Sequence, residues 1–296
     1  MITKRFHVEK ILVPYDFSES SESALEHAIV MARNFRAEIH LLHVVESFSF
    51  TTLISQAFTK SQSEFEAKVE EKAFEKLKEV ASAATAKLGR IVHSMMEKGK
   101  IFKTIINEAE KLNADIIVLG AHGAGGVQEK LIGSNASKIV MNASCPVLTV
   151  HSGTSHTNFK NILLPIDNSS VSRQKVRHTT EIARNYRATV HVVGAIDTSD
   201  TDLKRKFDLK VYQVGEFLDE HEVANTVKSV KGDQLAQIAL DNAELTNADM
   251  IVIMTEQEGS SLFLGNAAQH VINHSKVPVL TIRPDKGDPD KISVGY

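Results

Sequence analysis

The stretch ILVPYDFSESSESALEHAIVMARNFRAEIHLLHVVE, residues 11–46, decides the fold of this 296-residue chain. An apolar run at 10–15 precedes a segment, 20–35, whose apolar residues recur every three or four positions, and a second apolar run follows at 38–45. This order predicts a strand, a helix and a strand. Because two strands joined through a helix lie parallel in one sheet, the stretch predicts an α/β fold.

The same alternation continues to about residue 150. Apolar runs predict further strands at 91–95, 115–120 and 146–150, and helical periodicity marks 61–88, 101–112 and 135–143. Right-handed crossovers between parallel strands place helices on both faces of the sheet. The pattern therefore predicts a doubly wound, five-stranded parallel sheet, a Rossmann-like sandwich.

The chain then repeats itself. Residues 162–197, ILLPIDNSSVSRQKVRHTTEIARNYRATVHVVGAID, align with 11–46 without gaps, and thirteen of the 36 positions are identical. Two further pairs of segments are similar between the copies. NADIIVLG (113–120) matches NADMIVIM (247–254), and CPVLTV (145–150) matches VPVLTI (277–282). Repeats of this length indicate a duplicated domain. We expect domains at 1–151 and 159–284, a polar connection between them and a tail at 285–296.

Composition narrows the class of protein. The chain is 42% hydrophobic and 24% charged, which is ordinary for a globular protein, and its net charge of −3 gives no reason to expect nucleic acid as a partner. The single cysteine, Cys145, excludes an intrachain disulfide. The chain begins without a signal peptide pattern, and no apolar run is long enough to span a membrane. We therefore expect a soluble cytoplasmic protein.

A glycine pattern follows the predicted fourth strand. Gly120 ends that strand, Gly123 comes three positions later, and nine residues separate it from Gly133 and Ser134, which open a helix. We expect Gly120 to let a ligand approach the main chain and Gly123 to let the turn fold back. A helix start offers unpaired N–H groups and a positive dipole end, so it favours an anion.

Asp16 ends the first strand. In a doubly wound sheet, ligands bind at the carboxyl ends of the strands, near the switch in strand order. Asp16 therefore belongs to the same predicted site, where its carboxylate could accept hydrogen bonds from a ribose or a base. Together, these features predict a cradle for a phosphorylated ligand.

Other interpretations of the glycines are open. Glycines also serve turn geometry alone. A dehydrogenase fingerprint and a P-loop are both missing, because the sequence has neither Gly-x-Gly-x-x-Gly after its first strand nor Gly-x4-Gly-Lys-Ser/Thr. His122 could act as an acid or a base beside a phosphate, or simply line the loop.

With VPYDFSES after the first strand and HVVE ending the second, the spacing Gly-x2-Gly-x9-Gly-Ser resembles the universal stress protein family, in its tandem-domain, ATP-binding branch. The resemblance covers nearly the whole chain. It implies that the first domain binds ATP, or ADP or AMP, with Mg²⁺ as a companion of the nucleotide. The implied site residues are Pro14, Tyr15, Asp16, Val44, Leu119, Gly120, His122, Gly123, Gly133, Ser134 and Asn135.

The resemblance also assigns roles. Asp16 would hold the adenine or the ribose, the main chain at Val44 would contact the adenine, and Gly133 to Asn135 would bind phosphates. Gly120, His122 and Gly123 would line the ribose and phosphate side. Tyr15 departs from the family pattern, since it replaces a smaller residue before the aspartate.

The second copy departs further. It keeps Asp167 and Gly265, but Met254 and Gln257 stand at the positions of Gly120 and Gly123, and Asn266 replaces the serine. We expect a methionine and a shorter loop to crowd a triphosphate. The second site is therefore expected to be empty or to suit a smaller ligand.

Three functions follow from these observations. We favour a binding module that responds to adenine nucleotide levels and acts through an unidentified protein partner or a change of assembly, with no catalytic residue and no metal held by the protein. The alternatives are a slow ATPase or self-phosphorylating enzyme, and a nucleotide-free scaffold. The resemblance also implies that the last strands of the two copies pair across a pseudo-twofold axis, and that two chains associate as a homodimer.

Overall fold

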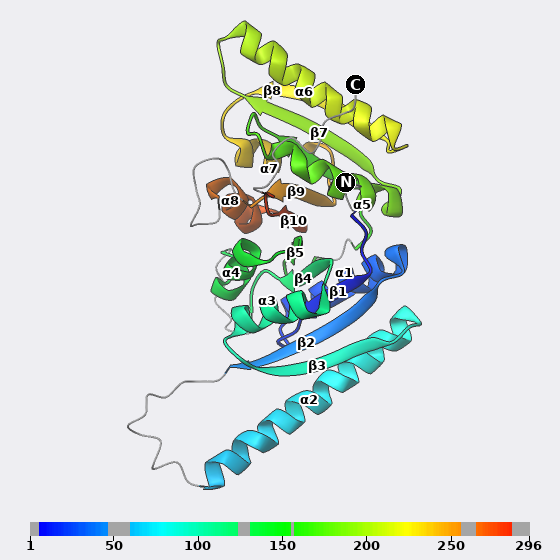
Figure 1. Cartoon of the computed structure of the whole chain (residues 1–296), viewed down its shortest axis with the longest axis vertical. Coiled ribbons are helices and arrows are strands. Elements are labelled where there is room, and N and C mark those ends of the chain that lie inside the picture. Colours follow the sequence, from blue (N-terminus) through cyan, green and yellow to red (C-terminus); the bar gives the residue numbers. More distant parts are fainter. Residues whose placement is uncertain (1–5, 47–59, 124–130, 155–156, 256–264, 286–296) are drawn as a thin grey trace, which may run out of the picture.

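The computed structural model describes residues 6–46, 60–123, 131–154, 157–255 and 265–285. Predictions that concern most of the loop after Gly123, the position of Gln257 and most of the tail lie outside these residues. Within them the chain folds as two successive sets of alternating strands and helices (Figure 1).

The elements of the first half follow the predicted order. Their bounds match the expected ranges within two residues, except that the third strand continues to Gly99 instead of ending near residue 95. The elements are β1 (Lys10–Pro14), α1 (Glu19–Phe35), β2 (Glu38–Glu46), α2 (Lys60–Leu88), β3 (Val92–Gly99), α3 (Ile101–Leu112), β4 (Ile116–Gly120), α4 (Ser134–Asn142) and β5 (Val147–Val150).

The second half repeats this order, with one added feature. A short 3-10 helix, η2 (Ser172–Lys175), precedes the first α-helix. The elements are β6 (Asn161–Ile166), α5 (Val176–Tyr186), β7 (Thr189–Ile196), α6 (Thr201–Glu220), β8 (Asn225–Lys231), α7 (Leu235–Leu245), β9 (Met250–Met254), α8 (Asn266–His274) and β10 (Val279–Ile282). No helix in the described ranges combines the length and the apolar character needed to cross a membrane.

The strands of both halves form one continuous sheet. Its ten strands are ordered β3-β2-β1-β4-β5-β10-β9-β6-β7-β8. Neighbouring strands are parallel except at the centre, where β5 and β10 pair antiparallel with Leu148 opposite Leu280. This topology confirms the predicted α/β fold of two five-stranded parallel sheets, and the predicted pairing of the last strands within one chain.

Helices cover both faces of the sheet and bury two apolar layers. One layer packs α1, α2, α5 and α6 against the strands, and the other packs α3, α4, α7 and α8. Both layers run through the two halves, so the halves share their cores. Strands covered on both faces must be apolar along their whole length, which explains the uninterrupted apolar runs in the sequence.

An aromatic residue just before β6 also belongs to the core. Phe159 is fully buried, and its ring lies 4.9 Å from that of Tyr186 and 6.1 Å from that of His27. Burying a phenylalanine side chain contributes about 1.5–3 kcal/mol. Phe159, the first residue of the expected second domain, therefore packs the second half on the first.

The recurring Asn-Ala-Asp sequence has a structural cause. Asn113 and Asn247 take left-handed main-chain angles, with φ of 50° and 48°, which an asparagine tolerates better than most residues. The aspartates that follow, Asp115 and Asp249, each accept two main-chain N–H bonds at the start of the neighbouring first strand, from Glu9 and Lys10 and from Lys160 and Asn161. Both copies thus align their fourth strand with their first by the same bonds.

Candidate functional site

A cavity of about 1290 Å³ opens at the carboxyl ends of the strands of the first half. It lies where β1 pairs with β2 on one side and with β4 on the other, which is the switch in strand order. Its volume is larger than the roughly 300–1,000 Å³ of most small-molecule sites. Each residue implied by the resemblance lies in its lining: Pro14, Tyr15, Asp16, Val44, Leu119, Gly120, His122, Gly123, Gly133, Ser134 and Asn135.

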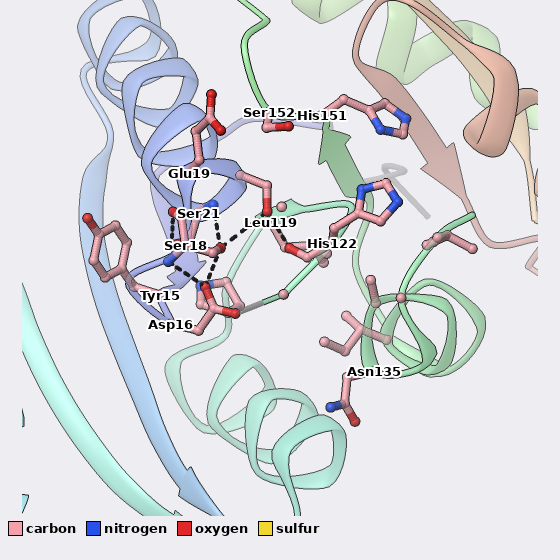
Figure 2. A pocket seen from close by; sticks show the side chains of 18 of the residues that line it. Tyr15, Asp16, Ser18, Glu19, Ser21, Leu119, His122, Asn135, His151 and Ser152 are labelled. Atoms are coloured by element: carbon pink, nitrogen blue, oxygen red, sulfur yellow. Dashed lines mark hydrogen bonds between the residues drawn. The ribbon is translucent and has the colours of Figure 1, made fainter. Parts of the chain in front are cut away.

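Asp16 is held by the turn that follows β1. Its Oδ1 accepts hydrogen bonds from the Ser18 main-chain N–H at 3.1 Å and from the Ser18 hydroxyl at 2.5 Å. Ser18 in turn caps α1, because its Oγ accepts a bond from Ser21 N at 3.2 Å. Between them Phe17 adopts a left-handed φ of 63°. The aspartate is thus fixed in position before any ligand arrives (Figure 2).

Gly120 serves the protein's own packing. A Cβ built on Gly120 would lie 2.6 Å from Ser20 Oγ and 2.8 Å from the Ser20 main-chain carbon. The first turn of α1 therefore rests directly on the end of β4, and the Ser20 hydroxyl donates to the carbonyl of His122. Gly120 also lines the cavity, so the close approach of α1 is a second reason for a glycine here, beside the approach of a ligand that we expected.

Gly123 brings two loops together. A Cβ at this position would lie 2.9 Å from Asp16 Oδ2. A Cβ on Gly133 would lie 3.9 Å from the Gly123 nitrogen. Asp16 is therefore close to the start of α4, although 117 residues separate Asp16 from Gly133 in the sequence.

The start of α4 has the features of an anion-binding end. Gly133 is its N-cap, with an ordinary φ of −60°, and the Gly133 N–H donates to the carbonyl of Ala121 at 2.8 Å. The amides of Ser134, Asn135 and Ala136 follow and, as in any helix, have no acceptor within the helix. The first turn contains no acidic residue that would oppose an anion. The available donors are thus these three amides, whereas the Gly133 amide is already used.

An apolar wall also lines the cavity. Pro14, Leu42, Val44 and Leu119 come from β1, β2 and β4, and Ile101 and Ile105 come from the first turns of α3. A flat apolar ring fits such a wall. Sequence analysis missed the two isoleucines; their signal is an apolar pair four residues apart at the start of the helix that follows the third strand.

Tyr15 is among the residues that line this cavity, but its ring extends towards the helices. It packs edge-on against Phe17, with ring centroids 5.3 Å apart, and lies between α1 and α2. Figure 2 shows it directed away from Asp16. Burial, followed by the charges of Glu22, Asp16 and Glu26, raises the pKa of Tyr15 to about 12. The departure from the family pattern at Tyr15 thus places a larger side chain between α1 and α2.

Two histidines meet at the same side of the cavity as α4. The ring centroids of His122 and His151 are 5.4 Å apart, and His151 Nε2 donates to the carbonyl of Ile272 at 2.7 Å. Burial lowers the pKa of His151, and the neighbouring His122 adds to this effect, while the bond to Ile272 opposes it. No cluster of three or more histidine, cysteine or acidic side chains in the described ranges is arranged to hold a metal ion.

The corresponding region of the second half is built differently. Met254, at the position of Gly120, is 6% exposed, and a methionine there leaves no room for a helix turn as close as that of α1. In agreement with this, the chain forms η2 and begins α5 only at Val176, the counterpart of Leu25. Gly265 still caps α8 and donates to Thr255 O at 2.8 Å, so the helix start itself is kept.

A buried lysine lies beside the second aspartate. The Lys175 ammonium donates to the Ser172 carbonyl at 2.7 Å and to the Ser172 hydroxyl at 3.1 Å. Burial lowers the pKa of Lys175 to about 8, against the attraction of Asp167. Burial acts to raise the pKa of Asp167, but the Lys175 charge and bonds from Ser169 and Ser172 lower it overall. Asp167 thus has a cation of the protein's own as its neighbour.

The fold defines a class of tandem, doubly wound α/β proteins with a crevice at the switch in strand order. This chain belongs to the universal stress protein family, whose model matches residues 7–151 and again residues 158–283. The two matches agree with the duplication found in the sequence.

Individual relatives match one half at a time. Universal stress protein MJ0531 of Methanocaldococcus jannaschii is 35% identical over 142 residues, which cover 48% of this chain and 81% of that protein. Universal stress protein MJ0577 of the same organism is 32% identical over 152 residues, covering 48% and 94%. A crystal structure of a universal stress protein from Archaeoglobus fulgidus matches 96% of this chain and 99% of its own, with a TM-score of 0.74 and 21% identity, and so shows a shared fold.

Proposed function

We propose that the first half of this chain binds ATP in the cavity at the ends of β1, β2 and β4, and that the protein acts as a nucleotide-responsive regulatory module. The adenine would lie on the apolar wall, the ribose beside Asp16, and the phosphates at the start of α4. ADP and AMP share these contacts in part, and Mg²⁺ would accompany the triphosphate.

One observation carries this proposal. A single cavity contains an apolar wall, a fixed carboxylate and a helix start without acidic residues, which are the groups that a base, a sugar and a phosphate chain need. Carboxylates accept bonds from sugar hydroxyls, and helix N-termini bind phosphates. A nucleotide-free scaffold has no need for this combination.

Two features of the second half support the binding of one nucleotide per chain. Met254 fills the position of Gly120, and the Lys175 charge lies near Asp167. A ligand hydroxyl would have to compete with an internal cation for this aspartate. We therefore propose that one chain binds one nucleotide.

Calorimetric titration of the purified chain with ATP tests the proposal. We expect about one equivalent bound by the wild type and no binding by Gly123→Val, because a side chain at this position displaces Asp16. Gln257→Val, the same substitution at the corresponding position of the second copy, is the matched control and should bind like the wild type. Two equivalents, or no binding by the wild type, would contradict the proposal.

Two related measurements address the alternatives. Phosphate release equal to that of buffer with ATP alone argues against an ATPase, and sedimentation with and without ATP reports whether chains associate. Because β5 and β10 already pair within one chain, a homodimer must form through another surface. We propose that two chains associate as a homodimer through such a surface.

A further inference from the structure

The cavity of the first half is completed by the second half. Four consecutive residues at the end of α8 and just beyond it, Asn273, His274, Ser275 and Lys276, contribute to its lining. Figure 1 shows α8 beside α4, on the same side of the sheet and next to the central strands. The halves therefore meet at the end of the cavity where α4 begins.

Asn273 makes the decisive contact at this junction. Its side chain is 8% exposed, and its Oδ1 accepts a hydrogen bond from the main-chain N–H of Ile132 at 2.8 Å. Ile132 directly precedes Gly133, whose own N–H is bonded to the carbonyl of Ala121. Two successive amides just before α4 are thus held by the protein, and only the amides after them are available to a ligand.

A second contact fixes the end of α8. His151, which directly follows β5, donates from Nε2 to the carbonyl of Ile272, the residue before Asn273. The last turn of α8 is therefore bonded to the first half at two adjacent residues, Ile272 and Asn273. The acceptor that holds Ile132 cannot shift without breaking one of these bonds.

The support is not reciprocal. In the alignment of the two copies, Met141 of α4 stands where α8 has Asn273. A thioether is only a weak acceptor and cannot replace a carboxamide oxygen. The second half thus gives the first a hydrogen bond to a carboxamide oxygen, and at the equivalent position of α4 the first half has no carboxamide to offer in return.

We propose that Asn273 is a positioning residue of the nucleotide site, and that the second half holds the start of α4 in the place where it meets phosphates. This inference rests on the proposed function. A misplaced helix start weakens contacts to phosphates but not contacts to adenine or ribose. Asn273 therefore contributes to the discrimination between ATP and adenosine.

The test compares ligands and variants on the full chain. We expect Asn273→Leu to weaken ATP binding tenfold or more in calorimetry, while adenosine binding changes less than threefold. Asn242→Leu, which removes another buried carboxamide of the same half, is the matched control and should leave both affinities unchanged. If the leucine variant does not fold, Asn273→Ala takes its place.

Hydrogen exchange separates positioning from general stability. The Ile132 amide should exchange faster in Asn273→Leu than in the wild type and in Asn242→Leu, even without ligand. Unchanged ATP affinity in a folded Asn273→Leu, or an equal loss for ATP and adenosine, would overturn the inference and leave the proposed function standing. If the wild type binds no adenine nucleotide, the proposed function is wrong and this inference falls with it.

Discussion

Thr149 of β5 and Thr281 of β10 donate reciprocal hydrogen bonds across the centre of the sheet. Thr149 Oγ1 donates to Val279 O at 3.1 Å, and Thr281 Oγ1 donates to Val147 O at 3.0 Å. Both side chains are 1% exposed. The pair adds side-chain bonds to an antiparallel junction of only three residue pairs. It thereby stabilises the contact between the halves, which brings the end of α8 to the cavity of the first half.

Replacing either threonine by valine should therefore have similar effects. A net hydrogen bond is worth about 0.5–1.5 kcal/mol, so Thr149→Val and Thr281→Val should each lower the free energy of unfolding by this amount. Urea denaturation measures it, with the exposed Thr201→Val as a control. A large loss for one threonine and none for the other would contradict the symmetric role.

Gly120→Ala should destabilise the fold. The new Cβ would lie 2.8 Å from the main-chain carbon of Ser20, and a main-chain atom cannot rotate away. Overpacking of this kind costs about 1–3 kcal/mol, again measured by urea denaturation. Stability equal to that of the wild type would show that α1 does not need its close approach to β4.

Gly123→Ala should affect binding more than stability. Its Cβ would lie 2.9 Å from Asp16 Oδ2, the end of a side chain that can turn aside. The expected result is a several-fold loss of ATP affinity in calorimetry with little change in the unfolding midpoint. The opposite result, a stability loss with full affinity, would remove Asp16 from the proposed site.

Stability should fall on mild acidification because of His178. Burial lowers its pKa from 6.5 to about 4, so the folded state resists protonation that the unfolded state accepts. The free energy of unfolding should be highest above pH 6.5 and decrease as the pH falls towards 4, by about 3 kcal/mol at most. In His178→Phe this part of the pH dependence should disappear; an unchanged profile would refute the assignment.

Lys175→Met should be strongly destabilising. It removes the cation whose charge lowers the pKa of Asp167, and with it two hydrogen bonds to Ser172; the loss of such partners typically costs about 1–3 kcal/mol. The double variant Lys175→Met, Asp167→Asn should recover most of this loss, because no buried charge is left. If the double variant is no more stable than the single one, the two groups are not coupled.

Local sequence patterns were enough to predict much of the fold. The spacing of apolar residues in 10–46 predicts a strand, a helix and a strand, as the structure has them. A helix buried on one face repeats its apolar residues every three or four positions, and a strand buried on both faces is a continuous apolar run. The spacing from Gly120 to Ser134 likewise marks the end of a strand and the start of a helix, since both are defined by neighbours in the chain. Pairing of the last strands followed from the family resemblance.

The sequence by itself determined the duplication, the α/β class, the family and the elements that carry the candidate site. Each of these can be recognised from short periodic runs of apolar residues or from a repeated motif. Only the tertiary structure decided that Gly120 faces Ser20, that the Tyr15 ring points into the helical layer, that the Lys175 charge acts on Asp167 and that Asn273 holds Ile132. Asn273 and Ile132 are 141 residues apart. Contacts of this kind depend on which faces of distant elements meet, and a single sequence contains no local signal for them.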